Sequence, residues 1–346
     1  MIIPRNYTSE SVTSGHPDKV CDQISDQILD QCLKQDSESR VAMEVFGSHN
    51  FLAIGGEVTT KAKVDYKKEA EEIYKLIGYQ DKLEITVNVL EQSNDIALGV
   101  DSGGAGDQGI MYGFATDETK EFMPRASILA HQLASQLEKT RRENPLVLGP
   151  DGKTQVTIQD NQIKTVLISS QHKENVSQEE LEEMIIKKVI EPIAGNGFNV
   201  LINPTGRFIV GGFTADTGLT GRKIMVDTYG GIIPHGGGCF SGKDATKVDR
   251  SAAYMCRFVA KNIVANNYAK QCLVSVAYAI GKEEPLMIEA FDEKNQSLTE
   301  LVKEKFDFRP RAIIERLNLK KPIYFKTASY GHFGREEFPW EEIVDL

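Results

Sequence analysis

The chain has 346 residues, of which 40% are hydrophobic and 26% are charged, and its formal net charge is −10. A chain of this length can bury a large core and typically forms two or three domains, and its acidic balance excludes general nucleic-acid binding, which needs a continuous basic surface. Its apolar runs, such as Cys272 to Ile280, are shorter than the roughly 18 residues that a membrane helix needs. We therefore expect no nucleic-acid and no membrane partner.

The location of the protein is predicted from its cysteines and its start. Five cysteines without a CxxC spacing argue against a disulfide framework and indicate a reducing compartment. The opening residues, MIIPRNYTSES, lack the apolar segment of a signal peptide. Both features predict a cytoplasmic protein.

The first part of the chain predicts helices and strands in alternation. Pro17 suits the first position of a helix, and Val20, Ile24 and Ile28 follow at intervals of four residues along one face. The predicted elements are a helix from residue 17, strands near 41–47 and 51–59, a helix near 65–77 and a strand near 83–90. A glycine-rich loop at 99–107 follows.

The remaining two thirds continue in the same irregular order. The predicted elements are a helix near 125–142, strands near 155–158 and 163–169, a helix around 178–189, a long helix that ends at about residue 266 and a strand near 273–280. Because strands and helices do not alternate regularly, the pattern favours an α+β fold with mostly antiparallel sheets.

One segment, HGGGCFSGKDATKVDRS from His235 to Ser251, has the composition of a polyphosphate site. Its consecutive glycines allow positive φ and bring backbone N–H groups close to an anion, and its two lysines add positive charge. Its two aspartates, Asp244 and Asp249, are suited to hold a divalent cation against that anion.

Two other interpretations of this segment stay open. The run GGCFSGK follows most of the P-loop pattern, but Asp244 stands where that motif needs Ser or Thr, and the preceding stretch 228–234 is broken by Gly and Pro. Alternatively, the glycines form an ordinary turn, and Thr246 and Asp249 form a capping box for the next helix.

Basic residues recur in glycine-rich loops of this acidic chain. They are Lys153 in PDGKTQ, Arg207 in NPTGRF, Arg222 and Lys223 in TGLTGRK, and Lys243 and Lys247 in the segment above. Ordinary solvated charge is the simpler interpretation of each one alone. Their clustering in loops indicates a focused anion site.

Six ordered segments resemble the S-adenosylmethionine synthetase family, also called methionine adenosyltransferases. They are TSESVTSGHPDKVCDQISD near the start, GAGDQG from residue 104, INPTGRF from 202, TGLTGRKIMVDTYGG from 217, HGGGCFSGKDATKVDRSAAY from 235 and YGHFGREEFPWE from 330. The resemblance spans nearly the whole chain. It implies three similar domains, at 2–95, 103–212 and 214–345, in a pseudo-threefold arrangement, each a mostly antiparallel sheet with helices packed on one face.

The resemblance also implies a reaction and its cofactors. The methionine sulfur attacks C5′ of ATP and expels tripolyphosphate, which the same enzyme hydrolyses to phosphate and pyrophosphate. Mg²⁺, two ions per active site, and K⁺ are the implied cofactors. The implied assembly is a homodimer, paired into a homotetramer, with active sites at the dimer interface. The basic loops fit this chemistry because fixed cations stabilise negative charge that develops on a leaving group.

Matching positions carry the family's roles to individual residues. The catalytic positions match His16, Arg222 and Lys243. The ATP pocket matches His16, Asp151, Lys153, Arg207, Phe208, Asp216, Arg222, Lys223, Cys239 and Lys243. The methionine site matches Glu57, Gln92, Asp216 and Lys247. The magnesium ligands match Asp18 and Asp249, and the potassium ligand matches Glu44.

The chain departs from the family at two places. Cys239 stands where many members carry Ala, and the stretch between Gln92 and Asp107, the lid of the family, is several residues shorter than in the common bacterial form. A shorter lid should discriminate less against larger methionine analogues.

Two other functions stay open at this point. One is a kinase-like phosphotransferase, which would release ADP, and the other is a regulatory nucleotide-binding module. Retention of His16, Asp18 and Asp249 argues against a module that only binds nucleotide.

Overall fold

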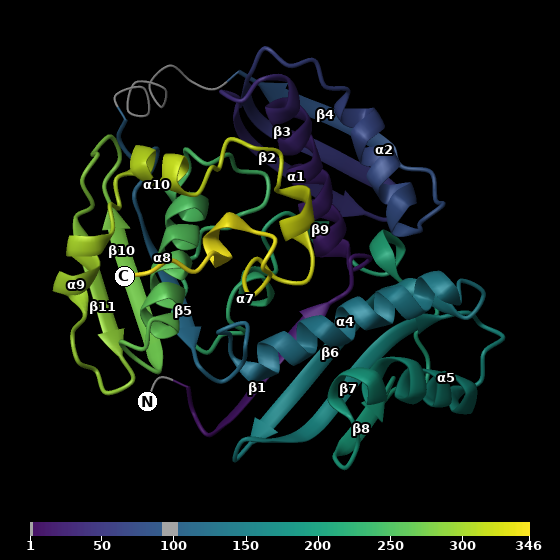
Figure 1. The fold of residues 1–346 in the computed structure, drawn as a ribbon. Coiled ribbons are helices and arrows are strands. Elements are labelled where there is room, and N and C mark those ends of the chain that lie inside the picture. Colours follow the sequence, from purple (N-terminus) through teal and green to yellow (C-terminus); the bar gives the residue numbers. More distant parts are fainter. Residues whose placement is uncertain (1–2, 92–102) are drawn as a thin grey trace.

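The computed structural model describes residues 3–91 and 103–346 and contains three β-sheets, each with a long helix packed against it (Figure 1). In the first sheet the strand order is β1-β6-β7-β8, and only β7 and β8 are parallel. The strands are β1 Asn6–Val12, β6 Leu148–Gln159, β7 Gln162–His172 and β8 Asn199–Ile202. Helix α4 (Arg125–Glu143) lies across β6 and β1 and buries its apolar face on them.

The second sheet has the order β4-β3-β2-β9, with β3 and β4 parallel. The strands are β2 Arg40–Ser48, β3 Phe51–Thr59, β4 Glu84–Leu90 and β9 Gly218–Leu219. Helix α1 (Pro17–Gln35) packs on β2, and α2 (Tyr66–Ile77) packs on α1 and β4. The side chain of Asp65 caps α2 by accepting the Lys68 N–H.

The third sheet, in the order β11-β10-β5, is entirely antiparallel. Its strands are β5 Gly109–Thr116, β10 Gln271–Tyr278 and β11 Met287–Asp292, and helix α8 (Val248–Ala265) covers β5 and β10. The shorter helices are α5 Gln178–Ile185, α6 Glu191–Ala194, α7 Ile224–Asp227, α9 Thr299–Lys305 and α10 Pro310–Arg316. Single turns of 3₁₀-helix lie at Gly212–Thr214, Phe325–Ala328 and Pro339–Glu341.

Strands from distant parts of the chain share each sheet. Strand β1 pairs with β6, β9 pairs with β2, and β5 pairs with β10. Each sheet therefore contains strands from two of the predicted domains, 2–95, 103–212 and 214–345. The bounds of these domains stay a prediction. The predicted α+β class with mostly antiparallel sheets is confirmed.

One predicted helix contains a π-helical turn in its second half. The chain is helical over the whole range expected, 178–189. It is α-helical to Ile185, forms a π-helical turn at Ile186–Ile190 and continues as α6. Pro192 has no N–H for the Lys188 carbonyl, and the wider turn accommodates it. The Gln136 amide instead donates to that carbonyl at 2.8 Å.

Helix α1 is buried around almost its whole circumference. Its predicted apolar stripe lies in the main hydrophobic core. Its opposite face carries aspartates at intervals of four, which the loops of the C-terminal part cover: Asp18, Asp22, Asp26 and Asp30. Among the described residues, no helix is long and apolar enough to cross a membrane.

Candidate active site

His16 is the N-cap residue of α1 and is only 2% exposed. Its Nδ1 accepts a hydrogen bond from the Asp18 N–H at 3.2 Å, so the ring proton sits on Nε2. Burial, followed by the charges of Lys223 and Lys153, lowers the pKa of His16 to about 2. The imidazole is therefore neutral and can donate only from Nε2.

The buried carboxylate of Asp18 gathers the loop that carries two predicted basic residues. Its Oδ2 lies 2.5 Å from Lys223 Nζ, and its Oδ1 lies 3.5 Å from Arg222 Nε. Oδ1 also accepts the Leu219 N–H at 3.0 Å. The predicted magnesium ligand and two predicted ATP-binding cations thus form one group next to His16.

Asp151 and Lys153 reach the same place from β6. Lys153 is exposed, and its charge acts on both His16 and Asp151. Asp151 Oδ2 accepts the Gly212 N–H at 2.9 Å, whereas its buried Oδ1 has no hydrogen-bond partner among the described residues. Burial raises the pKa of Asp151 to about 6, and the nearby Asp216 adds to this shift.

This raised pKa predicts a pH-dependent stability difference. The folded carboxyl holds its proton more tightly than the unfolded one, so Asp151 costs stability as the pH rises from about 4 to above 6. The free energy of unfolding of Asp151→Asn minus that of the wild type should increase by about 1–2 kcal/mol when the pH is raised from 5 to 7.5. Urea titrations of both proteins at the two pH values measure this, and parallel pH profiles would contradict it.

A second group of predicted residues surrounds Lys243. Its Nζ donates to Asp249 Oδ2 at 2.7 Å. Burial opposes its charge, but Cys239, Asp249 and Glu44 together raise the pKa of Lys243, so it stays protonated. The glycine-rich segment wraps the carboxylate closely, because a Cβ on Gly238 would lie 2.1 Å from Asp249 Oδ1.

The loop 216–223 joins the two groups. A Cβ on Gly221 would lie 2.4 Å from the Cβ of Cys239, which belongs to the Lys243 group. The Thr220 N–H donates to the Val45 carbonyl at 3.0 Å, beside Glu44. The structure therefore brings residues of α1, β2, β6 and two loops into one polar region.

Other predicted residues make no direct bond to these two groups. Exposed Arg207 pairs with Glu174 at 3.0 Å, and the Phe208 N–H donates to His172 Nε2 at 3.1 Å. Half-buried Glu57 lies on β3 opposite Ala42, which on its other side forms an isolated β-bridge with Lys243. The backbone of Glu57 is therefore two strand positions from that of Lys243. Among the described residues, no hydrogen bond or ion pair links Arg207, Phe208 or Glu57 to either group.

The methionine-site residues Lys247 and Gln92 differ in how much the structure says of them. Lys247 is bound to Asp244 at 2.5 Å, and Asp244 also accepts the Val41 N–H. Gln92 and Gly99, and with them most of the expected lid, lie outside the described residues.

The predicted capping box is wrong. Helix α8 begins at Val248 with Lys247 as its N-cap, and no side chain caps it. The Thr246 N–H, which Asp249 would accept in a capping box, donates instead to Asp244, and the Asp249 carboxylate accepts from Lys243. The P-loop alternative also lacks its context, because residues 228–234 contain no strand.

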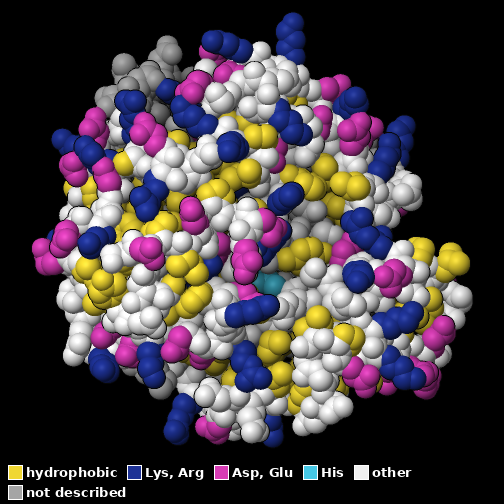
Figure 2. Space-filling view, in the orientation of Figure 1, with side chains coloured by type: hydrophobic (Ala, Val, Ile, Leu, Met, Phe, Trp, Pro, Cys, Tyr) yellow, Lys and Arg dark blue, Asp and Glu magenta, His cyan; other side chains and the backbone are white. Residues whose placement is uncertain are grey.

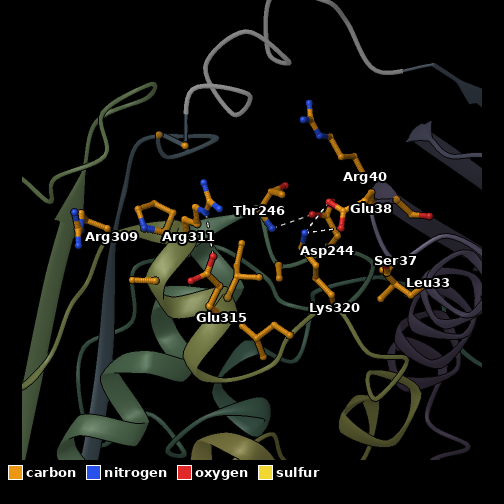
Figure 3. Close-up of a pocket in the computed structure, with 18 of the residues that line it drawn as sticks. Leu33, Ser37, Glu38, Arg40, Asp244, Thr246, Arg309, Arg311, Glu315 and Lys320 are labelled. Carbon is orange, nitrogen blue, oxygen red and sulfur yellow. Dashed lines mark hydrogen bonds and ion pairs between the residues drawn. The ribbon is translucent and has the colours of Figure 1, made fainter.

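A cavity of about 730 Å³ lies elsewhere, between the start of β2, the loop 244–246 and α10 (Figure 3). Several of its cations lie against carboxylates: Lys320 against Glu38, Arg311 against Glu315 and Arg309 against Asp307. Its charges are therefore balanced locally. On the face in Figure 2, basic and acidic side chains are likewise interspersed, unlike a nucleic-acid-binding surface.

Comparison with known families places this polar region in context. Models of three domains match consecutive parts of the chain: the S-adenosylmethionine synthetase N-terminal domain matches residues 5–98, the central domain 102–208 and the C-terminal domain 210–342. The chain belongs to the S-adenosylmethionine synthetase family. The predicted family and enzyme class are therefore confirmed.

Curated relatives match over nearly their full length. S-adenosylmethionine synthases of Mesoplasma florum, Pseudothermotoga lettingae and Petrotoga mobilis are 50%, 49% and 48% identical to the chain. The alignments cover 97%, 98% and 97% of this chain and 97%, 96% and 96% of those proteins. They extend over 365, 382 and 385 positions, so these synthetases carry residues that the 346-residue chain lacks.

Proposed function

We propose that this chain forms S-adenosylmethionine from ATP and L-methionine in the region around His16, Lys223 and Lys243. One observation carries the proposal: a buried, neutral imidazole lies among cations that come from separate loops. Such an arrangement suits a reaction whose leaving group, tripolyphosphate, carries several negative charges.

The basic side chains bind and orient the triphosphate. Lys153, Arg222 and Lys243 extend from three different loops or strands, so together they can hold a chain of phosphates from more than one side. This binding would align C5′ of ATP with the methionine sulfur, and such alignment is worth roughly 7–11 kcal/mol in favourable cases.

His16 acts as a hydrogen-bond donor. Its Nε2–H would point at the bridging oxygen that leaves C5′, because its Nδ1 is already occupied by the Asp18 N–H. Because the pKa of His16 is about 2, its imidazole stays neutral near pH 7. It therefore stabilises the developing negative charge without a change in protonation.

The metal ligands are proposed on the chemistry of their donors. In residues 3–91 and 103–346, no group of three or more His, Cys, Asp or Glu side chains is arranged so that it could hold a metal ion by itself. Mg²⁺ commonly uses only one or two carboxylates and completes its shell with substrate phosphates, so Asp18 and Asp249 fit ions that arrive with ATP. Bound Mg²⁺ would neutralise charge on the phosphates, and Glu44 is the proposed ligand for K⁺.

The remaining predicted residues complete the substrate sites in this proposal. Asp151, Arg207, Phe208, Asp216, Lys223 and Cys239 would bind ATP, and Glu57, Gln92, Asp216 and Lys247 would bind methionine. In this proposal a second copy of the chain completes each site.

The second copy would dock on the outer faces of the sheets. Phe46 and Phe51 are 39% and 38% exposed on the second sheet, with ring centroids 6.4 Å apart. Leu90 is 67% exposed at the end of the same sheet. We propose a homodimer with active sites at its interface, further paired into a homotetramer.

The dimer proposal predicts that activity depends on protein concentration. Activity per chain should fall once dilution separates the protomers, because each site would lose residues from its partner. Matched activity assays and analytical ultracentrifugation over a dilution series measure this. A monomer with full activity per chain would refute the shared site.

One incubation separates the proposed activity from its competitors. With ATP, methionine, Mg²⁺ and K⁺, we expect a sulfonium product by mass spectrometry, together with phosphate and pyrophosphate. Release of ADP would favour a kinase-like phosphotransferase, and unchanged ATP would favour a binding module. The cytoplasm is the proposed location, since all five cysteines are free thiols.

A further inference from the structure

The aspartate ladder of α1, defined as Asp18, Asp22, Asp26 and Asp30, is a buried acidic stripe that the proposed reaction leaves largely unused. The four side chains are 1%, 0%, 0% and 5% exposed. Burial of a carboxylate is costly unless charge and hydrogen bonds compensate it. Partners for these carboxylates therefore have to come from segments packed on the helix.

Each aspartate of the ladder accepts backbone N–H groups, and together the four bind three segments of the chain. Asp18 accepts from Leu219 at 3.0 Å, Asp22 from Gly221 at 2.8 Å, Asp26 from Gly242 at 2.8 Å, and Asp30 from Tyr324 at 3.0 Å and Phe325 at 2.9 Å. In Figure 1 the C-terminal segment, drawn in yellow, passes beside α1 in agreement with the last of these contacts.

A buried cation completes each of the two middle rungs. Lys19 Nζ donates to Asp22 Oδ2 at 2.9 Å and also to buried Asp227, while Asp22 Oδ1 accepts the Gly221 N–H. Arg250 holds both oxygens of Asp26, at 2.7 and 2.8 Å, and also donates to the Lys243 carbonyl at 2.9 Å. The Arg250–Asp26 pair therefore binds the loop at two successive residues, Gly242 and Lys243.

The two glycines that donate to Asp22 and Asp26 lie where a larger residue does not fit well. Gly221 has φ +80° and Gly242 has φ +81°, a region that favours glycine. A Cβ on Gly242 would lie 1.9 Å from the Met43 carbonyl oxygen. The residues that follow these glycines are Arg222 and Lys243, two of the proposed triphosphate-binding cations.

We infer that Asp22 and Asp26 are positioning residues of the adenosyl transfer, which set the places from which Arg222 and Lys243 reach the triphosphate. The inference rests on the proposed roles of those two cations. Asparagine cannot replace either aspartate. At Asp22 the two oxygens serve different donors, and asparagine has only one acceptor oxygen for Lys19 and the Gly221 N–H. At Asp26 Oδ1 accepts from both Gly242 and Arg250 Nη1, but the amide nitrogen of asparagine would turn a donor toward Arg250 Nη2 in place of Oδ2. The loop amide or the cation is then left without a partner.

Asp30 supplies a matched control. Its two oxygens also accept two donors, but the segment 324–325 carries none of the proposed substrate-binding residues. Asp22→Asn and Asp26→Asn should each raise the KM for ATP at least about fivefold, whereas Asp30→Asn should leave it within about twofold. KM does not depend on the fraction of folded enzyme, so a merely structural role would not move it.

The KM for added tripolyphosphate is the second readout and should rise with that for ATP. KM values within about twofold of the wild type for Asp22→Asn and Asp26→Asn would overturn the inference. A rise in Asp30→Asn equal to theirs would also overturn it, because the effect would then not depend on the basic loops.

A pair of triple variants keeps the test decisive if the single variants do not fold, and both replace Lys19 by Met and its second partner, Asp227, by Asn. In Lys19→Met/Asp22→Asn/Asp227→Asn the oxygen of residue 22 is free to accept the Gly221 N–H, but in Lys19→Met/Asp22→Leu/Asp227→Asn no acceptor remains. We expect the KM for ATP to be at least about fivefold higher in the leucine variant. Equal KM values in the two would refute the role of Asp22.

Lys243→Met and Arg222→Met separate this inference from the proposed function. If they raise the KM for ATP and the aspartate variants do not, only the positioning role fails. If they leave it unchanged, the proposed triphosphate site fails, and the positioning role falls with it.

Discussion

His16→Asn should slow S-adenosylmethionine formation by about 100-fold or more, the range observed when one donor to a developing oxyanion is removed. The asparagine oxygen can still accept the Asp18 N–H in place of Nδ1, so the N-cap of α1 is kept. Its side chain is too short to place a donor where Nε2–H lies. The loss would therefore report the donor and not the helix cap.

Hydrolysis of added tripolyphosphate provides the contrast, because it does not break the C5′–O bond. We expect His16→Asn to slow this step less than about tenfold. His16→Gln is the matched variant, since its longer side chain can reach the Nε2 position, and it should recover part of the rate of transfer. Equal losses in both half-reactions would instead indicate a general role in binding or folding.

Asp249→Asn should raise the Mg²⁺ concentration for half-maximal activity by about tenfold or more and lower kcat more than affinity for ATP. The asparagine can still accept the hydrogen bond from Lys243 Nζ, which now spans 2.7 Å, but it lacks the charge that a hard cation prefers. Titration of activity with Mg²⁺ at saturating ATP and methionine measures the effect.

Asp65→Asn is the control for this prediction. Asp65 caps α2, where asparagine is an equally good cap, and it is not part of the polar region. Its magnesium titration should match that of the wild type. A wild-type titration curve for Asp249→Asn as well would remove Asp249 from the metal site.

The helices of this chain were predictable where their signal is local. Pro17 and the apolar stripe behind it predict α1, and the structure has α1 from Pro17. The predictions near 65–77, 125–142 and 273–280 correspond to α2, α4 and β10. These elements bury one apolar face, and that periodicity can be recognised without knowledge of their partners.

Several strands were missed because their partners are remote in sequence. Strand β1 pairs with β6 about 150 positions further on, and the two-residue strand β9 exists only through its pairing with β2. Strand β5, GIMYGFAT, carries two glycines and lies between a helix and a strand that come much later in the chain. No local pattern contains those partners.

By itself, the sequence determined the family, the enzyme class and the candidate residues, because long ordered motifs persist however the chain is folded. Only the tertiary structure decided the state of those residues. It makes His16 a neutral donor, pairs Asp18 with Lys223, and binds the polar face of α1 to loops about 200 residues away. Protonation and pairing depend on burial and on nearby charges, and both are set by segments that meet only in the folded chain.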